Sequence, residues 1–211
     1  MTMKTEFHIV EDFRSVQGEG HYSGTFAQFV RLAGCNSPSK HLDCVDFCDT
    51  DYDVSRWTST LDGFEDWFGG QAPAPLLIFT GGEPLLYQDL LYEWITASRY
   101  LRETQVCIET NGTIDRDIPS VWHTVSPKGP LYRLGRGPIS EIKLVVTPEH
   151  LRNGISTSEL LSRLSDGQDC ELYLQPLDND LELARDIVER LISRRPEWKL
   201  SLQTHKLISM L

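Results

Sequence analysis

The sequence has no excess of positive charge, the feature that proteins binding nucleic acid usually show. Lysine and arginine number 20 against 31 aspartates and glutamates, so the formal net charge is −11. Because a phosphate backbone is bound by a basic stripe or patch, this composition argues against nucleic acid as the main partner. The acidic residues are scattered along the chain, and we attribute them to a solvated surface.

Long apolar runs are also missing. No stretch approaches the roughly 20 apolar residues that a membrane-spanning helix requires. The segment Met1 to Val10 has no apolar core of signal-peptide length. We therefore expect a cytoplasmic protein with no membrane contact. Disulfides are rare in that compartment, so the chain's 5 cysteines are better candidates for metal binding.

Internal repeats and low-complexity linkers are absent as well, which favours a single domain over residues 1–211. Strand-like and helix-like patterns alternate along most of the chain, and this alternation predicts parallel strands joined by crossovers. Two connections, 111–122 and 129–140, are too short and too rich in Gly and Pro for a proper helix. The sequence therefore predicts a partial, open α/β barrel of mostly parallel strands, with fewer helices than strands.

The hydrophobic periodicity places the elements of this barrel. One helix should start at Ser59 or Thr60, another should carry Leu90, Leu91 and Trp94 inward, and a third should start near Asn179 or Asp180. Strands are expected over residues 25–32, 76–79, 106–109, 124–126, 142–146, 172–175 and 200–204.

Unusual polar motifs follow the ends of these expected strands. The carboxyl ends of parallel strands form the mouth of an α/β barrel, so we expect the motifs to share one site. Side-chain alternation puts Arg31, Glu109, Lys143 and His205 on faces that line the barrel, unless these faces look outward and the apolar ones line it. The motifs are Gly34-Cys35, Thr80-Gly81-Gly82-Glu83-Pro84, Glu109-Thr110-Asn111-Gly112, Ser126-Pro127-Lys128, Gln175-Pro176 and Gln203-Thr204-His205.

Three cysteines, Cys35, Cys44 and Cys48, lie in one expected loop. Thiolates are soft ligands that suit iron–sulfur clusters or zinc. Three of them would leave one iron of a four-iron cluster open to a ligand. Alternatively, His41 could complete a closed zinc site with three cysteines and one histidine. The loop by itself is compatible with both interpretations.

The turn after the next strand favours the cluster. Gly81 and Gly82 let a ligand approach the backbone, and Glu83 can accept hydrogen bonds from an ammonium group. An open iron beside such a turn suits an amino acid that chelates the metal through its amine and carboxylate. The methionine part of S-adenosylmethionine is a group of this kind.

Longer motifs make the resemblance to known enzymes more specific. They are residues 13–20 (Phe-Arg-Ser-Val-Gln-Gly-Glu-Gly), residues 29–36 (Phe-Val-Arg-Leu-Ala-Gly-Cys-Asn) and Cys48-Asp49-Thr50, continued by residues 109–112, 126–128 and 202–206. In this order and combination the whole chain closely resembles the 7-carboxy-7-deazaguanine synthase family of radical S-adenosylmethionine enzymes. The cysteine spacing departs from the usual one, because eight residues separate Cys35 from Cys44 and three separate Cys44 from Cys48, while Phe47 keeps the aromatic position.

The resemblance implies a ring contraction of 6-carboxy-5,6,7,8-tetrahydropterin to 7-carboxy-7-deazaguanine, with release of ammonia, in queuosine and deazapurine biosynthesis. It also implies a [4Fe–4S] cluster, S-adenosylmethionine and Mg²⁺ as cofactors, a homodimer, and an electron donor such as flavodoxin. Two other functions stay open. One is a different radical enzyme, such as an activase acting on a partner protein, and the other is a zinc-stabilised binding protein without chemistry.

The resemblance further implies roles for individual residues. Cys35, Cys44 and Cys48 would ligate the cluster, and Thr50 would contact magnesium, with Asp49 as its competitor. Residues implied at S-adenosylmethionine are Gly81, Gly82, Glu83, Glu109, Ser126, Lys128 and Gln175. Residues implied at the substrate are Gln17, Glu19, Arg31, Gln203 and His205.

Several of these residues have plainer alternatives. Glu109 could cap backbone at a strand end, the segment around Glu19 could be an ordinary glycine turn, and Arg31 could form a salt bridge inside the barrel. The mostly apolar tail, residues 207–211, either packs over the pocket with its terminal carboxylate near the substrate or is the frayed end of a last strand.

Overall fold

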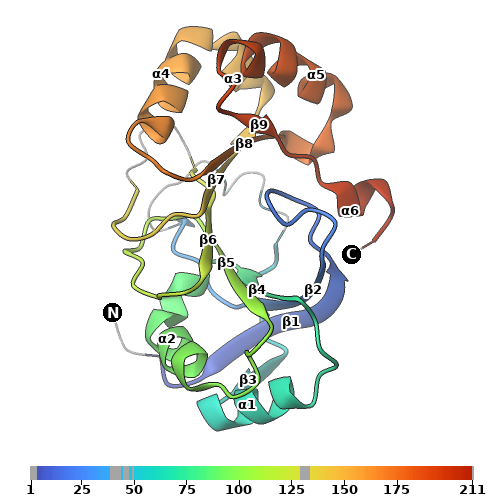
Figure 1. Ribbon diagram of the computed structural model, residues 1–211, viewed down its shortest axis with the longest axis vertical. Coiled ribbons are helices and arrows are strands. Elements are labelled where there is room, and N and C mark those ends of the chain that lie inside the picture. Colours follow the sequence, from blue (N-terminus) through green and yellow to red (C-terminus); the bar gives the residue numbers. More distant parts are fainter. Residues whose placement is uncertain (1–3, 39–43, 45–47, 49, 129–133, 211) are drawn as a thin grey trace.

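The structure is a computed structural model that describes residues 4–38, 44, 48, 50–128 and 134–210. Its centre is one nine-stranded sheet in the order β3-β1-β2-β4-β5-β6-β7-β8-β9 (Figure 1). From β2 to β9 neighbouring strands run parallel, whereas β1 pairs antiparallel with both β2 and β3. The strands are β1 (Phe7–Val16), β2 (Phe26–Leu32), β3 (Trp57–Ser59), β4 (Leu76–Gly81), β5 (Gln105–Thr110), β6 (Trp122–Val125), β7 (Glu141–Val146), β8 (Glu171–Pro176) and β9 (Lys199–Leu200).

This open, mostly parallel sheet confirms the predicted fold class. Six α-helices accompany the nine strands in the described part of the chain, so helices are fewer than strands. They are α1 (Leu61–Gly69), α2 (Gln88–Ala97), α3 (Pro148–Arg152), α4 (Gly154–Ser165), α5 (Leu181–Arg190) and α6 (Thr204–Leu207). In the described residues of the two short connections, 111–121 and 134–140, no helix forms. None of the helices in the described ranges is long and apolar enough to cross a bilayer.

Local capping sets two of the predicted helix starts. The Thr60 side chain accepts a hydrogen bond from the Gly63 amide, and Asp180 accepts from the amides of Glu182 and Leu183. These bonds satisfy amide groups that have no partner within the helix, which is why Thr and Asp favour this position. Five elements, β1, β3, α3, α4 and α6, do not appear in the sequence prediction. The β1 strand carries charged residues and an irregular register between Ile9 and Glu11, which hides the alternation of an ordinary strand.

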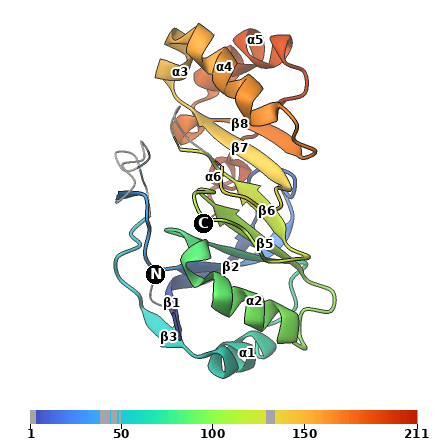
Figure 2. The same ribbon diagram turned by 90° about the vertical axis from the view of Figure 1, so that its left-hand side faces the viewer.

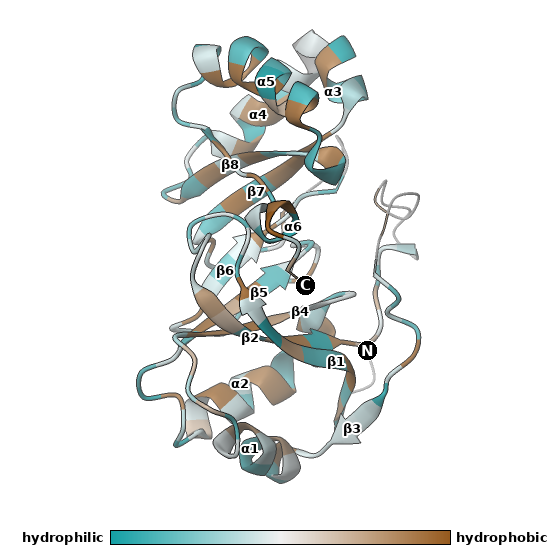
Figure 3. Cartoon of the chain, turned by 90° about the vertical axis from the view of Figure 1, so that its right-hand side faces the viewer, coloured by the Kyte–Doolittle hydropathy of each residue, from teal (hydrophilic) through white to brown (hydrophobic). Residues whose placement is uncertain are grey.

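The sheet separates an apolar, helix-covered face from a polar one. Alternate residues such as Val30, Phe79 and Ile108 pack with Trp94 of α2, while Ile142 and Leu174 pack with Ile187 of α5. Helices α1 and α2 lie at one end of the sheet and α3, α4 and α5 at the other, and both groups turn their apolar sides towards it (Figures 2 and 3). The intervening residues of the same strands look the other way, into the concave side.

The end of the chain differs from the predicted strand over residues 200–204. Strand β9 covers Lys199–Leu200, and Thr204–Leu207 forms α6 instead. Two bonds draw the chain away from the sheet, because the Gln203 amide donates to Asn179 Oδ1 (2.9 Å) and the Thr204 amide donates to the Gly18 carbonyl (3.0 Å). Gln203 and His205 therefore do not share a strand face.

The apolar tail is also placed differently from the packed alternative. The side chains of Leu207, Ile208 and Met210 are 51%, 61% and 41% exposed and do not line the cavity described below. Residue 211, whose carboxylate was expected near the substrate, lies outside the described residues.

Candidate active site

The carboxyl ends of β2 and β4–β8 open into one cavity of about 330 Å³. Segments 16–19 and 203–206 close its other side. Every predicted site residue lines this cavity except Glu83. The polar strand faces therefore look inward, and the alternative in which they face outward is wrong.

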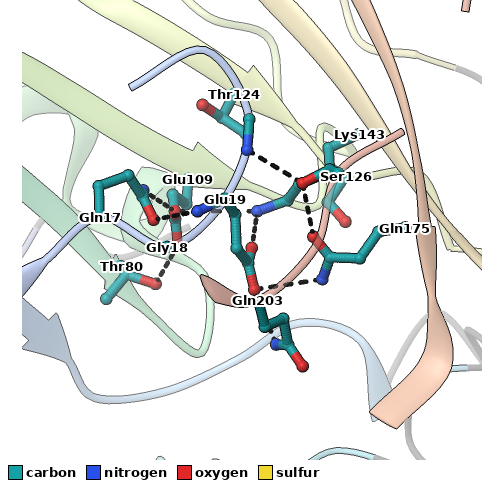
Figure 4. A network of polar contacts seen from close by, with 12 residues as sticks. Gln17, Gly18, Glu19, Thr80, Glu109, Thr124, Ser126, Lys143, Gln175 and Gln203 are labelled. Carbon is teal, nitrogen blue, oxygen red and sulfur yellow. Dashed lines mark hydrogen bonds and ion pairs between the residues drawn. The ribbon is translucent and has the colours of Figure 1, made fainter. Parts of the chain in front are cut away.

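One end of the cavity, here called the ionic end, is a network of Gln17, Glu19, Glu109, Lys143, Gln175 and Gln203 (Figure 4). Glu19 lies at its centre. Its Oε2 is paired with Lys143 Nζ, and its Oε1 accepts from Gln175 Nε2 (3.1 Å) and Gln203 Nε2 (2.7 Å). Burial alone would raise the pKa of Glu19, but the charge and hydrogen bond of Lys143 and the bond from Gln203 outweigh it and lower the pKa to about 2. Glu19 is thus ionised at neutral pH.

Glu109 is the second carboxylate of the ionic end. Its Oε1 accepts from Gln17 Nε2 (2.9 Å) and lies 3.9 Å from Lys143 Nζ, while its Oε2 accepts from Thr80 Oγ1 (2.9 Å). These partners come from the 17–19 loop, β4 and β7. Glu109 therefore ties three segments together at the cavity, a larger role than capping one strand end.

The loop that carries Glu19 is fixed by buried partners that the sequence did not single out. The His21 amide donates to Glu141 Oε2 (2.9 Å), and the Gly20 amide donates to Ser201 Oγ (3.0 Å). Gly20 has φ +62°, and a Cβ there would come within 2.4 Å of Glu141 Oε1. The left-handed φ and this close approach together favour glycine, so the loop is a specific structure and not only a flexible turn.

His205 packs against the same loop. A Cβ on Gly18 would lie 1.8 Å from His205 Nδ1, so glycine leaves room for the imidazole in its present position. Burial lowers the pKa of His205, although the charge of Glu19 opposes this shift. The ring is therefore largely neutral at neutral pH and offers both a donor and an acceptor.

Arg31 lies between the ionic end and the cysteine loop. Its Nε donates to Glu11 Oε1 (2.7 Å), and its Nη1 donates to Thr50 Oγ1 (3.3 Å). The salt bridge that was an alternative for this residue thus exists. It fixes one edge of the guanidinium, while Arg31 still lines the cavity. Thr50 also lines it, and Asp49 lies outside the described residues.

The glycine turn after β4 approaches the cysteine loop closely. A Cβ on Gly82 would lie 2.1 Å from the Gly34 carbonyl oxygen and 2.9 Å from Cys35 Cβ. Gly81 has φ +133°, a conformation that other residues rarely adopt. Both glycines line the cavity.

Glu83 supports this turn from the protein interior. It is 0% exposed, and its carboxylate accepts from the Leu85 amide, the Thr110 hydroxyl and the Asn111 amide. Burial raises its pKa, and these three hydrogen bonds oppose the shift. The carboxylate faces the protein interior and is not in position to receive a ligand's ammonium group directly.

The opposite end of the cavity, here called the cysteine end, is lined by Cys35, Cys44 and Cys48. All three are free thiols. Cys35 Sγ accepts from the Ser37 amide (3.4 Å), and Cys48 Sγ lies 3.8 Å from the Thr50 carbonyl oxygen. Burial raises the pKa of the Cys44 thiol, and the neighbouring charges of Cys35 and Cys48 add to that shift.

These thiols fit an iron–sulfur cluster in type and placement. Within the described ranges, no three His, Cys, Asp or Glu side chains converge on a point as they would around one metal ion. Cysteine thiolates are the usual protein ligands of a four-iron cluster, and all three of these cysteines line the same cavity. His41, the fourth ligand of the zinc alternative, lies outside the described residues.

Ser126 and Lys128 extend from β6 between the two ends. Lys128 Nζ donates to Ser126 Oγ (2.9 Å). Burial lowers the pKa of Lys128, which favours release of its proton relative to an exposed lysine. Together these residues present an amine and a hydroxyl to the middle of the cavity.

Comparison with known proteins identifies relatives over nearly the full length. The chain is 38% identical to the 7-carboxy-7-deazaguanine synthase of Bacteroides thetaiotaomicron over 207 residues, covering 96% of this chain and 97% of that protein. It is 34% identical to the synthase of the same name from Bordetella pertussis, covering 97% and 99%. No family model matches the chain.

A solved structure agrees with these relatives. The crystal structure of QueE from Escherichia coli superposes on the chain with a TM-score of 0.68 at 28% identity, covering 94% of each chain. The likeness in fold therefore extends over nearly the whole chain.

Proposed function

The chain belongs to the 7-carboxy-7-deazaguanine synthase family, and from this premise we propose that it is a carbon–nitrogen lyase acting on 6-carboxy-5,6,7,8-tetrahydropterin. The product is 7-carboxy-7-deazaguanine, a precursor for queuosine and related deazapurines, and ammonia is released. One observation carries the proposal. A buried, ionised carboxylate with fixed amide partners stands at one end of the same cavity that three free cysteines line at the other.

The ionic end suits the aminopyrimidine edge of a pterin. That edge presents parallel N–H donors, which a carboxylate accepts as a pair. The substrate therefore takes over the acceptor capacity of Glu19, with Gln17, Gln203 and His205 offering further donors and acceptors around the ring. Gln175 keeps the carboxylate in place while this exchange occurs.

The substrate carboxylate belongs at Arg31. Glu11 holds the Nε edge of the guanidinium and Thr50 accepts one hydrogen bond from Nη1, so the other N–H groups can bind a carboxylate in the cavity. Thr50 supplies a neutral oxygen next to this position. Magnesium keeps most of its waters and takes few protein ligands, so Thr50 fits as one Mg²⁺ contact provided that substrate oxygens complete the site.

Cys35, Cys44 and Cys48 would hold a [4Fe–4S] cluster through three irons. When bound, the cluster supplies the electron that cleaves S-adenosylmethionine, and the resulting radical removes a hydrogen atom from the substrate. Gly81 and Gly82 let the methionine part approach the backbone, while Glu83 holds their turn in shape. Ser126, Lys128, Glu109 and Gln175 line the rest of the cofactor's path.

The assembly and surroundings of the enzyme are part of the same proposal. We expect a cytoplasmic homodimer that receives its electron from a flavodoxin-type donor. Size-exclusion chromatography with light scattering tests the dimer, and turnover with reduced flavodoxin in place of dithionite tests the donor.

The direct test is anaerobic turnover of the reconstituted enzyme. With S-adenosylmethionine, Mg²⁺ and dithionite, 6-carboxytetrahydropterin should yield 7-carboxy-7-deazaguanine and ammonia in equal amounts, measured by mass spectrometry and an ammonia assay. A protein that cleaves S-adenosylmethionine but leaves the pterin intact would point to a different radical enzyme. A colourless, zinc-loaded protein would exclude radical chemistry altogether.

A further inference from the structure

Lys143 lies at the ionic end without a role in the assignments above. We propose that Lys143 is a positioning residue that keeps the Glu19 carboxylate ionised and aimed into the cavity, an inference that rests on the proposed function. It reaches the substrate only through Glu19.

The position of Lys143 follows from the pleat of β7. Glu141, Lys143 and Val145 alternate with the buried apolar residues of that strand and face the concave side. Lys143 is 5% exposed, and its ammonium group is paired with Glu19 Oε2 and lies 3.9 Å from Glu109 Oε1. A lysine this deeply buried is stable as a cation only when carboxylates surround it.

Among the charged groups around Glu19, Lys143 is the one that chiefly keeps its carboxylate ionised. The groups that act on this pair are the carboxylates Glu109 and Glu141, the amine Lys128 and the imidazole His205. Within the described residues, Lys143 is the cation that forms a salt bridge with Glu19. Lys128 acts from a greater distance and donates to Ser126 instead. His205 has a lowered pKa because of burial and is largely neutral.

Neutral partners cannot replace this cation. Gln175 and Gln203 both donate to Glu19 Oε1 and orient the carboxylate, but they carry no charge to offset its burial. Without Lys143, burial would dominate and raise the pKa of Glu19 above its ordinary value. The carboxyl group would then take up a proton as the solution becomes mildly acidic and would lose one acceptor for the N–H pair of the substrate.

The experiment measures binding of 6-carboxypterin, an oxidised stand-in for the substrate, by anaerobic equilibrium dialysis of the reconstituted enzyme. The wild-type Kd should be constant from neutral to mildly acidic pH, because the folded-state pKa of Glu19 lies far below this range. Lys143→Gln should weaken binding by at least about 30-fold and should introduce a further loss as pH falls. Lys143→Arg restores the charge and should restore the flat pH profile.

A matched control is Lys199→Gln. Lys199 on β9 pairs with Glu171 on the neighbouring strand β8, but Lys199 is solvent-exposed, Glu171 is partly exposed, and both lie outside the cavity. Its binding and pH profile should equal the wild type. Equal Kd values and flat profiles in wild type and Lys143→Gln would overturn the inference while leaving the proposed function intact. A wild-type enzyme that neither binds the pterin nor turns over the substrate would overturn both.

A double-mutant comparison covers the case in which Lys143→Gln does not fold. Glu19→Gln/Lys143→Gln carries no unpaired charge at this position, so it should be soluble even if the single lysine variant is not. If Lys143 acts through Glu19, the double variant should bind the pterin as weakly as Glu19→Gln and no more weakly. Losses that multiply would show an independent role for Lys143 and contradict the inference.

Discussion

The two ends of the cavity are stabilised in different ways. At the ionic end, side chains from the 17–19 loop, β5, β7, β8 and the segment before α6 are already joined by charged hydrogen bonds (Figure 4). At the cysteine end the described sulfurs have weak contacts, among them those of Cys35 with the Ser37 amide, of Cys48 with the Thr50 carbonyl and of Cys44 with the Ser37 side chain. Burial raises the pKa of Cys44, so this thiol stays protonated in the absence of a metal.

Under the proposed function, this difference would place substrate selectivity at the ionic end and the chemistry shared with other radical enzymes at the cysteine end. A preorganised ionic end binds a donor edge without paying for rearrangement. At the cysteine end, binding of the proposed cluster would be coupled to deprotonation of the thiols. Changes at the cysteine end, where the two ends meet and outside the cavity test this comparison, from the largest expected effect to the smallest.

Loss of a cluster ligand should have the largest effect. Cys35→Ala, Cys44→Ala and Cys48→Ala should each lose iron and show no measurable turnover, because a four-iron cluster held by two thiolates is not retained. Cys170→Ala is the matched control, since this half-buried thiol lies outside the cavity. Iron content and turnover are measured after anaerobic reconstitution. A Cys44→Ala protein with full iron and activity would remove Cys44 from the ligand set.

Gly82→Ala should strain the cysteine end specifically. Its Cβ would meet the Gly34 carbonyl oxygen at 2.1 Å, so the turn or the cysteine loop has to shift. We expect a loss of about 1–3 kcal/mol in the free energy of unfolding, together with poorer cluster retention. Gly154→Ala is the control, because nothing lies within 4 Å of a Cβ there. The measurements are denaturant unfolding and iron content after gel filtration. Equal stability and equal iron content in the two variants would show that the close approach at Gly82 is unimportant.

Magnesium removal should have an intermediate effect where the two ends meet. Chelator should lower turnover and added Mg²⁺ should restore it, since Thr50 contributes only a neutral oxygen and the substrate completes the site. Thr50→Val should reduce the Mg²⁺-dependent gain by roughly 3- to 10-fold, whereas Thr58→Val on the exposed edge strand β3 should not. Full turnover in metal-free buffer would argue against any role for the ion.

The tail should have the smallest effect. Leu207→Ser, Ile208→Ser and Met210→Ser alter exposed side chains outside the cavity. Each should change stability by less than about 0.5 kcal/mol and leave substrate KM unchanged. His205→Ala, two residues earlier in the chain, should raise KM because its ring packs against Gly18 in the cavity wall. A large KM increase in the tail variants would revive the packed-tail interpretation.

Much of this arrangement could be predicted from the sequence because it depends on local rules. Side-chain alternation along the strands placed Arg31 of β2 and Glu109 of β5 on the faces that line the cavity. The capping residues Thr60 and Asp180 marked two helix starts. The parallel topology and the convergence of motifs at the carboxyl ends of strands then followed from the order of elements.

The remaining features depend on long-range contacts that no local pattern records. The orientation of Glu83 is set by Thr110 and Asn111, far away in sequence. The path of the chain after β9 is set by hydrogen bonds from Gln203 to Asn179 and from Thr204 to Gly18, which hold this segment away from the sheet. The pairing of Lys143 with Glu19, more than a hundred residues apart, required the folded sheet to become visible.

The most direct test of a preorganised ionic end is pterin binding without the cluster. Equilibrium dialysis of 6-carboxypterin with Mg²⁺ present can compare the iron-free chain with the reconstituted enzyme. If the ionic end is complete on its own, the two Kd values should agree within about threefold. A loss of about 30-fold or more in the iron-free chain would show that the cluster builds the substrate end as well, and would contradict the account.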